Sequence, residues 1–158
     1  MKNIFNLSLV LVSLFALAAC GNTSKPTQLG TSDFSIVLPE GYSLTEDDYE
    51  EDQVAYYYKD DNSIDFDVYQ LEKGAEYTLV EEANYYAAQY GTAAESFTVN
   101  DIDGMKYTSE EEYENNVYTV VNYMVEDDTY IVELSFWTVN TADEYAAVEE
   151  IINTLNKN

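Results

Sequence analysis

The side chains of this chain that could take part in chemistry are mostly carboxylates and tyrosines. Its 158 residues include 31 Asp and Glu and 16 Tyr, with a single Cys and no His. Without His, the chain has no Ser-His-Asp or Cys-His nucleophile and no His-based zinc site. The six Gly residues are scattered and form no phosphate-binding loop for a nucleotide cofactor. Carboxylate chemistry and recognition by aromatic rings remain.

Two facing carboxylates could act as acid and base in glycoside hydrolysis. With 31 carboxylates in the chain, no pair is distinguished by its spacing or its neighbours. We therefore expect no enzymatic activity, and a carboxylate-dependent hydrolase is kept only as a further alternative.

Carboxylates are also suitable ligands for Ca²⁺, which binds hard oxygen atoms. Asp65 and Asp67 alternate on a predicted strand and therefore project from one face, beside an acidic turn at 60–61. They are the candidate metal ligands, and no other cofactor is expected. The alternative is that both belong to the exposed polar face of an antiparallel sheet.

A second acidic segment, residues 99–110, matches part of a calcium-binding EF-hand loop. Asp101, Asp103 and Gly104 fall at suitable positions, but Val99 offers no ligand oxygen at the first one. The flanks have the pattern of strands rather than helices. The segment therefore predicts a β-hairpin turn at Asp103–Gly104.

Tyrosine rings stack on sugars and anchor protein interfaces, where one end is apolar and the other wet. Tyr56 and Tyr58 share one face of a predicted strand, and Tyr69 shares a face with Asp65 and Asp67. These three tyrosines form the predicted binding surface. The alternative is ordinary packing of Tyr under helices and at sheet rims.

The first 20 residues form a targeting segment. Lys2 gives a positive start, an apolar run covers 4–16, and the segment ends in Leu17-Ala18-Ala19-Cys20. This ending closely resembles the lipobox of bacterial lipoproteins. The resemblance implies that the signal peptide 1–19 is removed, that Cys20 carries lipid, and that the protein is held on the outer face of the cell membrane. The alternative is an ordinary signal peptide with a chance cysteine.

The charge of the chain limits its partners. A formal net charge of −25 disfavours nucleic acid, whose binding depends on Lys and Arg neutralising phosphates. It would attract cations or basic partners. An aromatic content of 15% argues against disorder, because disordered acidic segments are poor in aromatic residues.

The remaining sequence predicts a tether and one domain. Residues 20–32 are small and polar, which indicates a flexible tether after the lipidated cysteine. Residues 33–158 have the length of a single domain. Its alternating apolar residues predict seven strands, and two helices begin at the capping boxes Thr78–Glu81 and Thr141–Glu144. The expected fold class is α+β, with six to seven antiparallel strands in βββ-α-ββββ-α order covered by the two amphipathic helices.

This order resembles the PsbP-like fold. The opening strand, residues 33–42, is an apolar strand ending in Pro-x-Gly-aromatic, as in that family. The resemblance implies a middle helix, a long antiparallel meander and a C-terminal helix, and it favours binding over catalysis. We therefore expect a surface-tethered, non-enzymatic binding or accessory domain for a protein, peptide or glycan. A Ca²⁺-responsive acidic module is the alternative.

Overall fold

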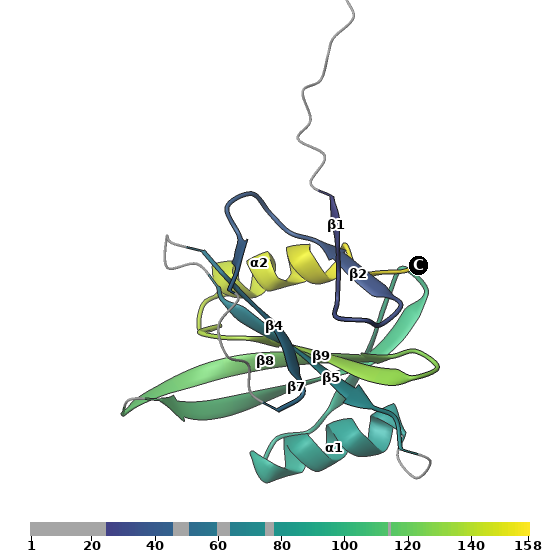
Figure 1. Cartoon of the computed structure of the whole chain (residues 1–158). Helices are drawn as coiled ribbons and strands as arrows, with labels where there is room; N and C mark the ends of the chain where they lie inside the picture. The colour runs from purple at the N-terminus through teal and green to yellow at the C-terminus, as the bar shows by residue number, and fades with distance from the viewer. Residues whose placement is uncertain (1–24, 46–50, 60–63, 75–77, 114) are drawn as a thin grey trace, which may run out of the picture.

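The computed structural model describes residues 25–45, 51–59, 64–74, 78–113 and 115–158 (Figure 1). Its largest element is a seven-stranded sheet in which all neighbouring strands are antiparallel. In spatial order the strands are β3 (Ser43–Leu44), β4 (Gln53–Tyr58), β5 (Phe66–Glu72), β9 (Tyr130–Phe136), β8 (Asn116–Glu126), β7 (Ile102–Tyr113) and β6 (Glu95–Val99). The predicted α+β class with a long meander is confirmed.

A second, three-stranded sheet joins the two ends of the domain. It has the order β1-β2-β10 and consists of β1 (Pro26–Gln28), β2 (Phe34–Val37) and β10 (Asn156–Lys157). Residues 26–28 of the predicted tether, 20–32, therefore form a strand of this sheet, ahead of the predicted start of the domain at 33. The cause is Leu29, which is fully buried and whose backbone N–H bonds to the Phe34 carbonyl at 2.9 Å.

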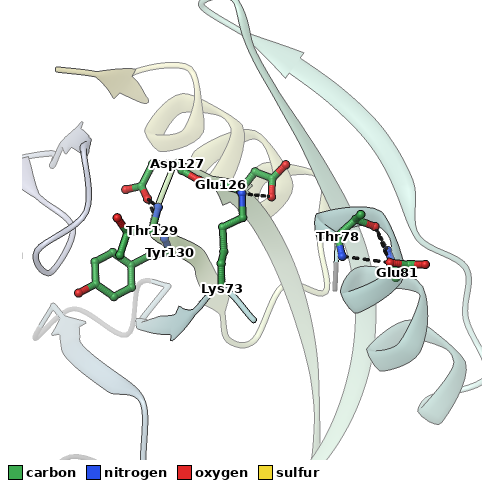
Figure 2. Close-up of polar contacts among 7 residues, drawn as sticks. All are labelled: Lys73, Thr78, Glu81, Glu126, Asp127, Thr129 and Tyr130. Carbon is green, nitrogen blue, oxygen red and sulfur yellow. Dashed lines mark hydrogen bonds and ion pairs between the residues drawn. The ribbon is translucent and has the colours of Figure 1, made fainter. Parts of the chain in front are cut away.

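Both predicted helix starts are confirmed. In α1 (Leu79–Gln89) the Thr78 hydroxyl accepts from the Glu81 backbone N–H at 3.2 Å, and the Glu81 carboxylate accepts from the Thr78 N–H at 3.0 Å (Figure 2). Helix α2 (Ala142–Ile152) begins with the same reciprocal pair, Thr141 and Glu144. Such boxes satisfy backbone donors that a helix start leaves free.

The two faces of the large sheet are covered differently. Helix α2 and the small sheet lie on one side, and α1 lies on the other (Figure 1). The α2 side holds the main core, in which Phe66 and Phe136 stack with ring centroids 4.9 Å apart. The residues of strand β9 alternate between the two faces: Val132 and Leu134 face this core, and Ile131 faces α1.

Helix α1 covers only part of its face. It packs Leu79, Ala83 and Ala87 on residues of β7, β8 and β9. A helix with its side chains is about 10–12 Å across, whereas seven strands side by side span roughly 29 Å. The rest of this face is therefore left without a covering element among the described residues. No helix in the described part of the chain is long and apolar enough to cross a membrane.

The hairpin between β6 and β7 differs from the prediction. Its turn residues are Asn100 and Asp101, both with positive φ (47° and 61°), and Val99 pairs with Ile102. The predicted turn at Asp103–Gly104 is wrong, because Gly104 lies within β7 opposite Phe97. A Cβ on Gly104 would come within 2.5 Å of the Phe97 ring, so the glycine leaves room for this aromatic side chain.

Candidate functional site

The uncovered part of the sheet forms a groove with a volume of about 610 Å³. Its floor is built by β5, β7, β8 and β9, and the side of α1 that carries Tyr86 and Tyr90 forms one wall. Trp137 and the segment 51–53 line the groove as well. The site thus combines strands from both halves of the chain with the middle helix.

The floor of the groove carries a continuous polar row across four strands. Strand register places these side chains opposite one another in the order Tyr107, Asn122, Ser135 and Asp67. All four are buried, with between 3% and 6% of their surface exposed. Buried polar groups cost stability unless they are hydrogen-bonded. A polar row at the base of a groove is the arrangement expected where a polar ligand is recognised.

Glu133 lies in the next row, between Met124 and Tyr69, and also lines the groove. It is 8% exposed, and its Oε1 accepts a 2.6 Å hydrogen bond from the Tyr107 hydroxyl. Within the described residues, no protein group donates to its other oxygen, Oε2. Burial raises the pKa of Glu133 to about 7, the negative charge of Glu82 adds to this, and the Tyr107 hydrogen bond opposes it.

The tyrosines of the wall stay neutral at physiological pH. Burial, with the charges of Glu82 and Glu133, raises the pKa of Tyr86 to about 12. A hydrogen bond to Glu111, with burial, raises the pKa of Tyr90 to about 12 as well. Tyr86 stacks on Tyr107 with ring centroids 6.5 Å apart. This wall therefore offers aromatic faces and neutral hydroxyl groups.

The predicted metal ligands, Asp65 and Asp67, lie on this same face of the sheet, but each accepts hydrogen bonds from its own set of partners. Asp67 is buried and accepts from Gln53 Nε2 at 2.6 Å and from the Trp137 indole N–H. Asp65 accepts from the Tyr56 hydroxyl at 3.0 Å and from the Lys59 backbone N–H at 3.2 Å. The alternative of an exposed polar face is wrong for Asp67.

The described residues contain no group of three or more Asp, Glu, Cys or His that could hold a metal ion. The calcium hypothesis therefore stays a prediction that receives no support from this geometry.

The predicted tyrosine surface is divided between two places. Tyr69 lines the groove. Tyr56 and Tyr58 stack on each other beyond Asp67, with centroids 6.2 Å apart, while Tyr57 packs into the main core. Cys20 lies outside the described residues.

Sequence reasoning missed Glu133 and the tyrosines of α1 as site residues. The available signal was the alternation of β9, which puts Glu133 on the same face as Trp137, between Ile131 and Ser135. The sequence did not indicate that α1 would leave this part of the sheet face uncovered as a groove.

Comparison with solved structures supports the fold. The chain is similar to the solution structure of cyanobacterial PsbP (CyanoP) from Synechocystis sp. PCC 6803, with a TM-score of 0.62 and 12% identity over 90% of this chain and 99% of that one. It is also similar to a crystal structure from Bacteroides thetaiotaomicron VPI-5482, with a TM-score of 0.57 and 19% identity over 83% of this chain. The match covers 49% of the Bacteroides chain, so the present chain corresponds to about half of it.

No protein-family model matches the chain, and neither does any curated protein. The structural similarities confirm the predicted PsbP-like fold, and at these identities they carry no further conclusion about activity.

Proposed function

We propose that this protein is a non-enzymatic binding domain, held on the outer face of the cell membrane by lipid on Cys20, and that its ligand occupies the groove beside α1. The single observation that carries the proposal is the polar row at the base of that groove. Burying Asn122, Ser135 and Asp67 on an incompletely covered sheet face costs stability that apolar side chains would not. A volume of about 610 Å³ is in the range of small-ligand sites.

The tethered location is supported by the lipobox, Leu17-Ala18-Ala19-Cys20. Because β1 begins at Pro26, lipid on Cys20 would hold the domain within about 20 Å of the bilayer, the length of six extended residues. The acidic domain would be repelled by anionic headgroups, so the anchor rather than surface charge would keep it there.

A matched pair of tyrosines allows a test of the groove. Tyr90, at the C-terminal cap of α1, is 42% exposed and lines the groove, while Tyr145 is 41% exposed on α2 and does not. Ligand-observed NMR with a panel of monosaccharides, amino acids, amines and short peptides would identify compounds that bind the wild type. The proposal predicts that Tyr90→Ala weakens their binding at least fivefold and Tyr145→Ala does not. Equal effects of the two variants, or no binder in the panel, would contradict it.

The anchor is tested separately in cells. Native protein should incorporate a labelled fatty acid and fractionate with the membrane, and Cys20→Ser should abolish both. Unmodified wild-type protein released into the medium would show that the tether is absent.

One observation favours a second candidate function, a carboxylate-dependent hydrolase. Asp67 and Glu133 both line the groove, and the β5–β9 register makes them diagonal neighbours on one face. Such positions are about 7–8 Å apart, which is compatible with an acid and base pair in glycoside hydrolysis. Turnover of chromogenic glycosides that is lost in both Asp67→Asn and Glu133→Gln would establish it. Absence of turnover would leave binding as the function.

A further inference from the structure

We infer that the ligand of the groove is a small organic cation, carrying an amine or a quaternary ammonium group. This inference rests on the proposed function of the groove as a binding site. It is argued from three independent features of the lining: the sign of its charge, its aromatic walls, and a buried carboxyl group without a counter-charge.

The charge of the lining is of one sign. Five carboxylates line the groove, and no Lys does among the described residues; they are Glu51, Asp52, Asp67, Glu111 and Glu133. The chain has no Arg or His to supply positive charge. Lys73 is engaged elsewhere, with Glu126 at 2.9 Å (Figure 2). This lining repels phosphates and carboxylates and attracts positive ligands.

The walls are aromatic. Tyr69, Tyr86, Tyr90 and Trp137 line the groove around the carboxylates. The faces of Tyr and Trp rings attract organic cations, which shed their water more readily than metal ions do, and aromatic cages are the usual recognition sites for quaternary ammonium groups. A metal ion would instead need several oxygen ligands converging on one point. No such group exists among the described residues.

Glu133 supplies the specific contact. It is more than nine-tenths buried and lines the groove, and from the residues that the structure describes only its Oε1 receives a hydrogen bond, from Tyr107. The other groups that act on it are Glu82 and Tyr86 of α1 and Tyr90 at the C-terminal cap of that helix, one negative and two neutral, and Tyr69 is its cross-strand neighbour on β5. None of them balances a negative charge, so an external cation would stabilise the ionised form of Glu133.

The burial of Glu133 couples binding to pH. Because burial raises its pKa to about 7, much of the empty protein carries a neutral Glu133 at neutral pH. A bound cation favours the ionised form and therefore releases a proton. Affinity for the cation should rise as pH increases from 6 to 8, whereas a neutral ligand should lack this dependence.

The test uses choline and its neutral isostere 3,3-dimethylbutanol, titrated by NMR into the wild-type domain at pH 6 and pH 8. The inference predicts saturable shifts of the Trp137 indole N–H by choline. The affinity should be about five- to tenfold higher at pH 8 than at pH 6, the range that a free-protein pKa of about 7 allows, and at least tenfold above that of the isostere.

Glu133→Gln should weaken choline binding at pH 8 at least tenfold. Glu149→Gln is the matched control, because Glu149 accepts a 2.6 Å hydrogen bond from Tyr123 in the same way but does not line the groove. It removes the same charge and should change the affinity less than twofold. Equal losses in both variants would indicate non-specific attraction to the acidic surface and overturn the inference.

The remaining outcomes separate the inference from the proposed function. Equal binding of the isostere, or binding of neutral sugars that Tyr90→Ala weakens, overturns the cationic ligand and leaves the groove as a binding site. If Ca²⁺ binds saturably at the groove and no organic cation does, the inference is overturned and the ligand is a metal ion. If no probe of any charge shifts groove resonances, both the inference and the proposed function fail.

Discussion

The hydroxyl of Tyr107 on β7 donates a 2.6 Å hydrogen bond to Oε1 of Glu133 on β9, across the intervening strand β8. The pair lies between the part of the sheet face that α1 covers and the part left open as the groove. Tyr107 packs with the small core under α1, and Glu133 lines the groove. The bond therefore connects the packing of the helix to the ionisation of the carboxyl group that would meet a ligand.

The raised pKa of Glu133 predicts that the wild type loses stability as pH rises. An acid whose pKa is about 7 in the folded state and about 4.5 in the unfolded state binds more protons when folded, so its contribution is complete below 4.5 and lost as pH rises through 7. Between pH 4 and pH 8 the free energy of unfolding should fall by roughly 2–3 kcal/mol more in the wild type than in Glu133→Gln. Urea denaturation at the two pH values measures this, and parallel pH profiles would contradict it.

Removal of the Tyr107 hydroxyl should raise the pKa of Glu133 further. The hydrogen bond favours the ionised carboxylate, so Tyr107→Phe removes the one hydrogen bond that opposes the burial effect. The side-chain carboxyl resonance of Glu133, followed by ¹³C NMR across pH 5–9, measures the change. Tyr123→Phe removes the equivalent donor to Glu149 on the other side of the sheet and should leave the Glu133 titration unchanged. A lower pKa in Tyr107→Phe would show that the bond acts on the neutral form.

Among the carboxylates outside the groove, Asp127 is expected to cost the most stability when it is substituted. Its Oδ1 accepts from the backbone N–H groups of Thr129 and Tyr130, both at 2.7 Å (Figure 2). Its Oδ2 accepts from the Asp33 N–H at 2.9 Å. Asp127→Ala leaves three donors without their acceptor and should lower the free energy of unfolding by about 3 kcal/mol. Asp128→Ala, which changes an exposed neighbour, should cost less than about 0.5 kcal/mol.

The pH dependence provides a second check on Asp127. Burial alone would raise its pKa, but the three backbone hydrogen bonds and the nearby Lys157 outweigh burial and lower it below the ordinary value of 3.8. Its stabilisation should therefore be present above pH 3.8 and decline as pH falls below that value. The deficit of Asp127→Ala relative to wild type should shrink in acid, and a deficit that is constant from pH 7 to pH 2 would exclude this account.

Gly104 should not tolerate a side chain. A Cβ there would lie 2.5 Å from the Phe97 ring and 2.6 Å from the Met124 carbonyl oxygen, so Gly104→Ala should destabilise the domain by about 1–3 kcal/mol. Gly91 has a positive φ of 69° but open space around it, so Gly91→Ala should cost only the backbone penalty of about 1 kcal/mol. Thermal unfolding of the two variants compares these costs, and a Gly104→Ala variant as stable as wild type would mean that Phe97 moves away freely.

The fold was largely predictable because its signals are local. The two capping boxes fixed the starts of α1 and α2, and the alternating apolar residues indicated the strands. The two differences between the predicted and the observed fold, at the start of the domain and in the β6–β7 turn, have local causes as well. Leu29 is a lone apolar residue in a polar segment, and Asn100–Asp101 competes with Asp103–Gly104 as a hairpin turn.

The site was less predictable because it depends on tertiary coverage. Asp67 and Tyr69 were correctly expected to share a face, but Glu133 could not be distinguished among 31 acidic residues. Its environment is set by how much of the sheet face α1 covers and by a tyrosine two strands away, and neither relationship is encoded in the residues next to it.

The most direct measurement of the central claim is the pKa of the Glu133 carboxyl group, determined by ¹³C NMR with and without saturating choline. The account predicts a value near 7 in the free protein and a decrease of at least one unit when the groove is occupied. A pKa near 4.5 in the free protein, or one that choline leaves unchanged while it binds, would contradict the assignment of this groove to a cationic ligand.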